Sequence, residues 1–412
     1  MKDGTNHQPS TKKMTNKELL KIADEFGTPV YVYDVESIRH QYEKLTSSFG
    51  KKTRFFYAAK ALTNINILKY VKKLGASLDC VSINEVKLGL KAGFAPQNIL
   101  FTPNCVDLAE IEEAMHHKVH INIDNISILE QFGNKYGSSY PIFVRINPHI
   151  FAGGNYKIST GHIDSKFGIS IHQLRHIERV MNTTGINVEG LHMHTGSEIK
   201  DPEVFLQGLE IMFGLAEHFP NLKYLDMGSG FKVPYQDGEM ETDVKELGKK
   251  VEKAIHEFAK ESGKHFELWF EPGKFLVSKS GYLLVKANVI KQTTATVFVG
   301  VNSGFNHLIR PMFYDSYHII ENISNPKGTE RIYTVVGNIC ETDTFAWDRK
   351  IHEVREGDIL IFRNAGAYGF EMSSNFNSRL KPAEVMFLDG KAHLIRKRDE
   401  FEDLLRNQVE VL

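Results

Sequence analysis

Between residues 53 and 273, short apolar runs alternate with longer stretches in which apolar residues recur every three or four positions. This alternation predicts repeated strand and helix units on a parallel sheet. Eight strand-like runs favour a closed (β/α)₈ TIM barrel over an open sheet. They lie at residues 53–59, 77–82, 98–102, 119–124, 141–147, 188–194, 223–228 and 267–272.

Beyond Gly273 the helical pattern stops, and strand-like runs separated by turn residues follow: YLLVKANVIKQ, TATVFVGV, RIYTVVG, DILIFRNAG and PAEVMFL. We therefore expect the barrel over residues 36–280 and a C-terminal β-domain, sandwich-like or barrel-like, over residues 281–412. Residues 1–35 are expected to hold a lead-in of sixteen polar residues, without a function of its own, and a strand in TPVYVYD that joins the C-terminal sheet.

Length and charge narrow the class of protein. The 412 residues suit a barrel of roughly 250 residues plus a second domain. The formal charge of -1 provides no broad positive field for nucleic acid or anionic membrane. Cys80, Cys105 and Cys340 lack disulfide or metal-ligand spacing, and no apolar run approaches the roughly 20 residues of a membrane span. We expect a cytoplasmic protein with a small-molecule partner and no metal.

Reactive residues of βα-barrels lie at the C-terminal ends of the strands. Lys60 directly follows the first predicted strand. It is either a solvated rim charge or, if apolar neighbours lower its proton affinity, an amine able to attack an aldehyde. His194 and Ser197 follow the sixth strand in HMHTGSE. They form either an ordinary turn or a site in which the imidazole stacks on a flat ring and the serine binds an anion.

The last two barrel strands end in DMGSGF and FEPGK. Gly228, Ser229 and Gly230 form a turn whose N–H groups are able to converge on a phosphate, although glycines also serve plain turns. Glu271 places a carboxylate at the barrel mouth, where it needs a cationic partner. That partner is either a neighbouring Lys or Arg or the protonated nitrogen of a pyridine ring.

An amine, a stacking imidazole, a phosphate turn and a carboxylate for a ring nitrogen together meet the requirements of pyridoxal 5'-phosphate (PLP). These motifs resemble the fold-type III PLP-dependent decarboxylases, which include diaminopimelate, ornithine and arginine decarboxylases. The resemblance runs from GTPVYVYD to KPAEV, nearly the whole chain. By its YAAKA, HTGS, MGSG and EPGK motifs, it implies that Lys60 binds the cofactor covalently. The other cofactor-binding residues that it implies are Asp79, His194, Ser197, Gly228, Ser229, Gly230, Glu271, Gly273 and Lys274, with Glu85 also near the cofactor.

The C-terminal motifs NHLIRPMFYDSYH, CETDTF and GAYGFEMSSNFNSR resemble those of the diaminopimelate decarboxylase group in particular. The resemblance implies that Cys340 donates a proton and that Glu341 binds the distal amine of the substrate. It also implies that Arg310 and Tyr314 bind the distal carboxylate, with Lys274 in contact with the substrate, and that Tyr368 contacts both phosphate and substrate. Cys340 and Glu341 would reach the active site of the other subunit of an obligate homodimer.

The reaction implied is decarboxylation of meso-2,6-diaminopimelate to L-lysine and CO₂, the last step of lysine biosynthesis. A substrate with a second amino-acid head needs both a cation and an anion far from the reacting carbon, which Arg310 and Glu341 supply. Taken alone, Arg310 also suits a surface or interface ion pair. Cys340, taken alone, also suits a small buried apolar position.

Four positions depart from the pattern of the group. Lys274 stands in place of an arginine and loses its bidentate geometry. Ser229 replaces a glycine, which the turn tolerates if the φ angle of this residue is negative. Glu371 stands where a small residue is expected, and Asn302 stands where aspartate is expected. The sequence explains neither of these last two residues.

Three alternatives remain open from the sequence. Another decarboxylase of the same cofactor class would act on carboxynorspermidine, ornithine or arginine. A racemase of related fold would have arginine, rather than Glu271, at the pyridine nitrogen. A non-catalytic regulator that kept the fold would be expected to have lost Lys60 or Cys340, and both are present.

Overall fold

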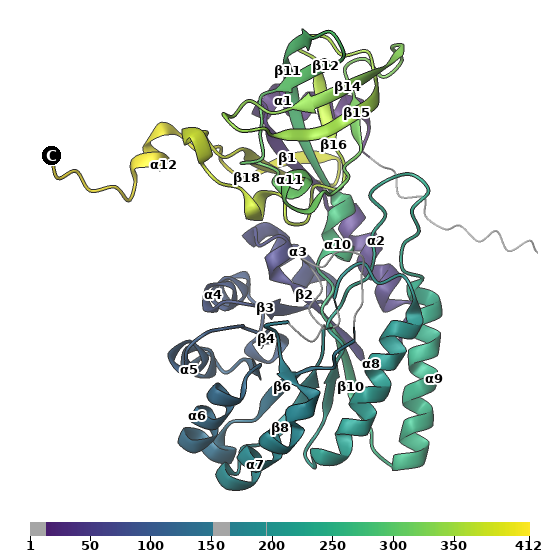
Figure 1. The fold of residues 1–412 in the computed structure, drawn as a ribbon, viewed down its shortest axis with the longest axis vertical. Coiled ribbons are helices and arrows are strands. Elements are labelled where there is room, and N and C mark those ends of the chain that lie inside the picture. The colour runs from purple at the N-terminus through teal and green to yellow at the C-terminus, as the bar shows by residue number, and fades with distance from the viewer. Residues whose placement is uncertain (1–13, 151–164, 195) are drawn as a thin grey trace, which may run out of the picture.

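The computed structural model describes residues 14–150, 165–194 and 196–412 (Figure 1). The barrel occupies the lower part of Figure 1 and the C-terminal strands the upper part, with the short helix α10 (Lys274–Val277) between them. No helix of the described residues is both long and apolar enough to cross a membrane. The domain limits at residues 35 and 280 stay predictions.

Within the described part of the chain, eight parallel strands form the barrel, as predicted, and the pairings β10–β2 and β5–β6 close it. A further two-residue strand, β7 (Ile169–Ser170), adds to β6 and was not predicted. The barrel strands are β2 (Thr53–Ala58), β3 (Ser77–Cys80), β4 (Ile99–Phe101), β5 (His120–Ile123), β6 (Ile142–Asn147), β8 (Val188–His192), β9 (Tyr224–Asp226) and β10 (Glu267–Phe270).

Local sequence signals set the helices around the barrel. In α4 the Ser82 side chain accepts a hydrogen bond from the backbone N–H of Glu85, and Gly93 ends the helix at a φ of 89°. A Cβ at Gly89 would lie 2.5 Å from Leu78, so this glycine lets α4 pack closely on β3. The longer outer helices are α2 (Val35–Thr46), α3 (Ile65–Leu74), α4 (Ile83–Ala92), α5 (Leu108–His116), α6 (Ile126–Tyr136), α7 (Leu174–Thr184), α8 (Pro202–Leu215) and α9 (Val244–Ser262).

The second sheet has the strand order β15-β14-β12-β11-β1-β17-β18, with β16 paired to both β11 and β13. The N-terminal strand β1 lies inside it, antiparallel to β11 and parallel to β17. Strands β13, β15 and β18 were not predicted. The strands are β1 (Val30–Asp34), β11 (Gly281–Gln292), β12 (Val297–Val301), β13 (Ile320–Asn322), β14 (Glu330–Val336), β15 (Thr344–His352), β16 (Ile359–Phe362), β17 (Ala383–Leu388) and β18 (Lys391–Arg396).

The prediction that the first sixteen residues form a lead-in is wrong for residues 14–16, which belong to the folded structure. Met14 is buried in a small core cluster, and Thr15 and Glu18 form a reciprocal capping box at the start of helix α1 (Asn16–Phe26). The capping box satisfies N–H groups that would otherwise lack partners, which explains why the helix begins at this polar stretch. The rest of the predicted lead-in, residues 1–13, lies outside the described residues.

The structure explains two residues that the sequence left unexplained. The Asn302 side chain accepts a hydrogen bond from the Lys286 N–H at 2.8 Å and donates one to the Thr28 hydroxyl at 2.9 Å. The Glu371 carboxylate accepts hydrogen bonds from the Thr63 N–H at 2.9 Å and from the Thr63 hydroxyl at 2.7 Å. Glu371 therefore ties the β-domain to the loop that follows Lys60.

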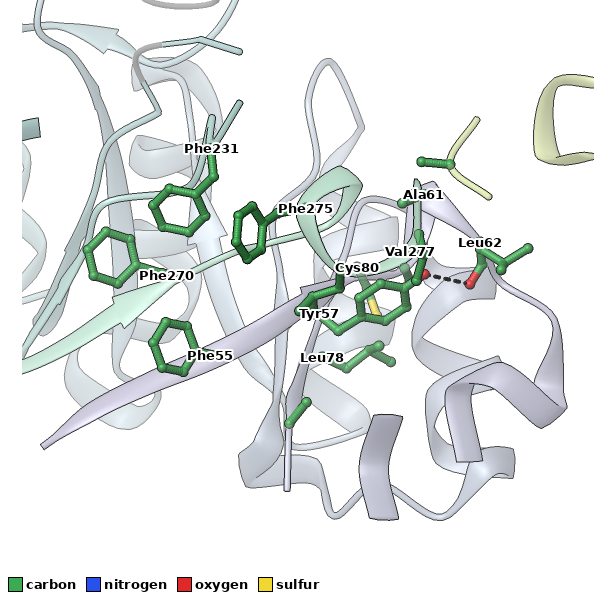
Figure 2. Close-up of a cluster of buried hydrophobic side chains, with 14 of the residues drawn as sticks. Phe55, Tyr57, Ala61, Leu62, Leu78, Cys80, Phe231, Phe270, Phe275 and Val277 are labelled. Atoms are coloured by element: carbon green, nitrogen blue, oxygen red, sulfur yellow. Dashed lines mark hydrogen bonds between the residues drawn. The ribbon is translucent and has the colours of Figure 1, made fainter. Parts of the chain in front are cut away.

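Figure 2 shows the apolar packing next to this loop. Tyr57, at 0% exposure, lies in the figure close to Cys80 and Val277, and its hydroxyl donates to the Leu62 carbonyl at 3.0 Å. The Ala61 carbonyl accepts a hydrogen bond from the Tyr368 N–H at 2.9 Å. The backbone on the C-terminal side of Lys60 is thus bonded to the barrel core and to the β-domain.

Candidate active site

A cavity of about 740 Å³ opens at the C-terminal ends of the barrel strands and is closed on one side by the β-domain. It brings together most of the site residues predicted from the sequence. Those that line it are Lys60, His194, Ser197, Ser229, Gly230, Glu271, Gly273, Lys274, Arg310, Tyr314 and Tyr368.

Lys60 lies in a short 3₁₀ turn directly after β2 and points its amine at β3. Its Nζ lies 2.7 Å from Oδ2 of the buried Asp79. Burial lowers the pKa of Lys60, but attraction by Asp79, Tyr368 and Glu271 outweighs it and raises the pKa above its ordinary value. The expectation of a lysine with reduced proton affinity is therefore wrong for the protein without a bound ligand, because Asp79 holds the charged form.

The loop after β8 and the glycine turn after β9 pack tightly against each other. The His194 Nδ1 accepts a hydrogen bond from the Ser229 N–H at 3.1 Å. Burial, with repulsion from Arg145, lowers the pKa of His194 to about 3, so its ring is a neutral flat surface. A Cβ at Gly228 would lie 2.5 Å from His194 Nδ1, so only glycine fits beneath the imidazole.

The glycine turn bends sharply, and two of its N–H groups donate within the chain, from Gly228 to Asp226 Oδ1 and from Ser229 to His194 Nδ1. Gly228 has a φ of 60° and Gly230 a φ of 125°, whereas Ser229 is absent from the residues with positive φ. The serine therefore meets the condition under which it replaces a glycine. A Cβ at Gly230 would lie 2.5 Å from the Gly196 carbonyl oxygen, so the two loops approach each other too closely for any other residue at this position.

Glu271 directly follows β10 and is a buried carboxylate at the cavity wall. Its Oε2 lies 3.1 Å from Nε2 of His192, and its Oε1 lies 3.5 Å from the Thr102 hydroxyl. Burial raises the pKa of Glu271, but the hydrogen bond and attraction of His192, with attraction by Lys60, outweigh it and lower the pKa to about 2. The carboxylate is thus ionised at the cavity wall, where it is able to pair with a cationic group.

Arg310 supplies a second cation, in the wall formed by the β-domain. It begins helix α11 (Arg310–Tyr314), is buried, and lies over the rings of Tyr235, Tyr314 and Tyr368 at 5.3, 5.8 and 6.0 Å. None of the carboxylates in the described residues lies within ion-pair distance of it, so the structure does not support the alternative of an ion pair within the chain.

Cys340 and Glu341 do not line the cavity of their own chain, and both are exposed. The Cys340 N–H donates to Asn377 Oδ1 at 2.8 Å, and the Asn377 amide lies 3.1 Å from the Cys340 sulfur. The reading of Cys340 as a buried apolar residue is therefore wrong. Whether the two residues serve another subunit stays a prediction.

Several cavity residues were missed in the sequence. Arg145 lies at the end of β6 with its guanidinium 4.8 Å from the Phe167 ring centroid, and Thr102 and Tyr235 also line the cavity. His192 lies just behind Glu271. A signal existed for Arg145, because a charged residue in the apolar run PIFVRIN requires a partner at a strand end.

The sequence profile described as "Pyridoxal-dependent decarboxylase, pyridoxal binding domain" matches residues 35–278, more than half of the chain. The chain belongs to the pyridoxal-dependent decarboxylase family. Diaminopimelate decarboxylases of Methanothermobacter thermautotrophicus and Escherichia coli K12 are 38% and 34% identical to it, each over 95% of this chain and over 94% and 96% of the relative.

Solved structures of the same decarboxylase group share the fold. One diaminopimelate decarboxylase structure aligns with a TM-score of 0.88 and 34% identity, covering 96% of this chain and 98% of the other. The Helicobacter pylori diaminopimelate decarboxylase complexed with L-lysine aligns with a TM-score of 0.86 and 30% identity, covering 94% of this chain and 98% of the other.

The residues of the cavity fit the family's cofactor, PLP. Lys60 offers an amine, His194 a flat neutral ring, and Glu271 an ionised carboxylate. Oδ1 of Asp79 is buried without a hydrogen-bond partner in the described residues. Ser197, Ser229 and Gly230 line the same cavity, and the two serine hydroxyls are donors of the kind that a phosphate group requires.

Proposed function

We propose that this protein removes a carboxylate from meso-2,6-diaminopimelate to give L-lysine and CO₂. The observation that supports the proposal most is that one cavity contains both the Lys60 amine and the buried Arg310. A buried guanidinium that has no carboxylate partner among the described residues suits a substrate that carries a second carboxylate. The similarity to diaminopimelate decarboxylases over about 95% of the chain supports the same substrate.

Bound PLP supplies an electron sink for the electrons released when the carboxylate leaves. Lys60 holds the cofactor covalently through its ε-amine, and His194 supports the face of its ring. The turn at Gly228, Ser229 and Gly230, with Ser197 and Gly273, surrounds the phosphate. Glu271 stays ionised and so favours a protonated ring nitrogen.

The substrate is held by residues from both domains. Arg310 and Tyr314 bind the distal carboxylate, Lys274 gives a point-charge contact, and Tyr368 contacts substrate and phosphate. Arg310 is already oriented by three aromatic rings, so little side-chain freedom is lost on binding.

We further propose an obligate homodimer that shares its active sites. Cys340 protonates the α-carbon, and Glu341 binds the distal amine, both from the partner subunit. The exposure of both residues in the single chain and their absence from its own cavity support this arrangement. We also place the protein in the cytoplasm, because Cys80, Cys105 and Cys340 are all free thiols.

The deciding experiment supplies purified protein with PLP and meso-diaminopimelate and measures lysine and CO₂. Carboxynorspermidine, ornithine and arginine complete the substrate panel, and turnover of one of these in place of diaminopimelate would replace the proposed substrate. Lys60→Ala is expected to lose the absorbance band of covalently bound cofactor and all turnover. Cofactor absorbance and turnover in that variant would refute the role of Lys60.

A further inference from the structure

Behind the cavity wall, three neighbouring strands end in a buried cluster of ionisable side chains. His192 ends β8, Asp226 ends β9 and Glu271 follows β10, and β9 pairs with both of the other strands. One imidazole nitrogen and one oxygen of each carboxylate lie within 4.8 Å of one another, and all three side chains are buried. The function proposed above uses Glu271 alone.

The hydrogen bond between His192 and Glu271 has a defined direction. Glu271 is an ionised acceptor, so the His192 Nε2 must carry the hydrogen and donate to Oε2 at 3.1 Å. The other ring nitrogen, Nδ1, is buried and has no hydrogen-bond partner in the described residues. The imidazole therefore has one strong contact, and that contact is with the carboxylate at the cavity wall.

The two oxygens of Glu271 consequently have different environments. Oε2 is held by His192, whereas Oε1 lies 3.5 Å from the Thr102 hydroxyl, which itself lines the cavity. The Asp226 side chain also interacts with the Glu271 carboxylate. A carboxylate with one oxygen fixed has a defined plane. Its second oxygen remains available to a donor in the cavity.

Asp226 completes the cluster and connects it to the glycine turn. Its Oδ1 accepts a hydrogen bond from the Gly228 N–H at 2.8 Å. Burial and repulsion by Glu271 raise the pKa of Asp226 well above its ordinary value. The cations that face this group of carboxylates are Lys60, beside Asp79 and Glu271, and Arg145, beside Glu271, Asp124 and Asp79.

We propose that His192 is a positioning residue that fixes Oε2 of Glu271, so that Oε1 meets the ring nitrogen of the cofactor in ionised form. Asp226 connects the same cluster to the glycine turn through the hydrogen bond from the Gly228 N–H. This inference rests on the proposed cofactor role of Glu271 but not on the identity of the substrate.

The experiment compares His192→Leu with His218→Leu as a matched control. His218 also bonds a glutamate, with Nδ1 2.7 Å from Glu178 Oε1, but this pair is exposed on the outside of the barrel. Leucine has no donor, so loss of the His192 N–H removes an attraction that lowers the pKa of Glu271. The other titratable groups that face Glu271 are unchanged, namely Lys60, Asp79, His194, Arg145 and Asp226.

In His192→Leu we expect the absorbance spectrum of bound PLP, measured without substrate, to become pH-dependent at acid pH where the wild-type spectrum is constant. We expect kcat to fall by about 10- to 100-fold, the loss typical when a hydrogen-bonded partner that orients a functional group is removed. KM is expected to change little, because His192 does not line the cavity. His218→Leu is expected to match the wild type in spectrum, kcat and KM.

Because an apolar residue can disturb a buried site, His192→Asn provides a second, polar variant whose shorter side chain does not reach Glu271 Oε2, and circular dichroism shows that each variant is folded. Folded variants with the wild-type spectrum, pH profile and kcat would overturn the proposal. So would a stoichiometric divalent metal in the purified wild-type protein, because the cluster would then be a metal site. The spectra need no substrate, so they test His192 even if diaminopimelate is not turned over.

Discussion

The Lys274 ammonium group lies 2.9 Å from the carboxylate of Glu198 and 3.1 Å from the Ser197 hydroxyl, all at the same cavity. The lysine that replaces the arginine expected at this position is therefore already paired within the chain. Glu198 adopts a positive φ of 65°, a conformation uncommon for a residue with a side chain, and Lys232 lies 3.7 Å from its other oxygen. An anion that binds Lys274 must compete with Glu198.

Glu198→Gln is expected to strengthen anion binding at the cavity, because it removes the competing charge from Lys274. We expect the Kd for PLP to fall several-fold, corresponding to about 1 kcal/mol for a partly buried ion pair. Lys274→Met should have the opposite effect. Titration followed by cofactor fluorescence measures both. A double variant whose change equals the sum of the single changes would show that the two residues are not coupled.

The same pair predicts a pH dependence of stability. Burial would raise the pKa of Glu198, but attraction by Lys274 and Lys232 outweighs it and lowers the pKa below 4.5. A carboxyl group whose pKa is lowered by folding contributes stability above its unfolded pKa, and this contribution is lost as the pH falls through the lowered value. Acid unfolding should therefore begin at higher pH in Lys274→Met than in the wild type. Coincident acid transitions of the two proteins would contradict this.

Glu371 is expected to hold the segment that carries Lys60. Glu371→Ala removes both hydrogen bonds to the partly buried Thr63, which costs about 1 kcal/mol. Hydrogen exchange of residues 61–64 should become faster, and PLP should dissociate more readily. Glu321→Ala, which removes the 2.7 Å bond to Arg363 in the same domain, is the matched control and should leave this segment unchanged.

Trp269 is expected to contribute most to the stability of the aromatic cluster in the barrel core. It is 0% exposed and packs with Phe56, Phe143 and Tyr224, at ring-centroid distances of 4.2 to 4.9 Å. Trp269→Ala should lower the free energy of unfolding by about 3 to 5 kcal/mol through lost contacts and a cavity. Chemical denaturation followed by circular dichroism measures the loss. Met240→Ala, at a residue that is 72% exposed, serves as the control and should change stability by less than about 0.5 kcal/mol.

The parts of the fold that the sequence predicted are those buried on both faces. The eight barrel strands are short runs rich in apolar residues, and most of their residues are buried, because helices cover one face and the barrel interior the other. The missed strands β15 and β18 are the two ends of the second sheet, and β18 contains no buried residue. An edge strand needs no continuous apolar run, so TFAWDRKIH and KAHLIR carry no clear strand pattern.

The residues of the candidate site likewise include some that the sequence predicted and others that it did not. Lys60, His194 and Glu271 stand at strand ends, where position alone predicts a shared cavity. The roles of His192, Arg145 and Glu198 depend on which side chain of another strand or loop meets them, which a single sequence does not contain. The proton affinity of Lys60 was misjudged for this reason, because the opposing Asp79 lies on a different strand.

The proposed sharing of active sites between subunits makes a quantitative prediction for mixed dimers. Lys60→Ala and Cys340→Ala homodimers should each be inactive or nearly so. If Cys340 serves the partner's cavity, a hybrid dimer has one site with both substitutions and one intact site. Refolding the two variants together in equal amounts should then restore about a quarter of the wild-type activity, because half of the dimers are hybrids with one working site.

Mixing Lys60→Ala with Glu271→Ala provides the control, because both residues line the cavity of the same chain. Each site of that hybrid contains one substitution, so no intact site forms and no activity should return. Restoration by Glu271→Ala, or none by Cys340→Ala, would contradict the assignment. The exposed position of Cys340, away from its own chain's cavity, leads us to expect restoration in the first mixture alone.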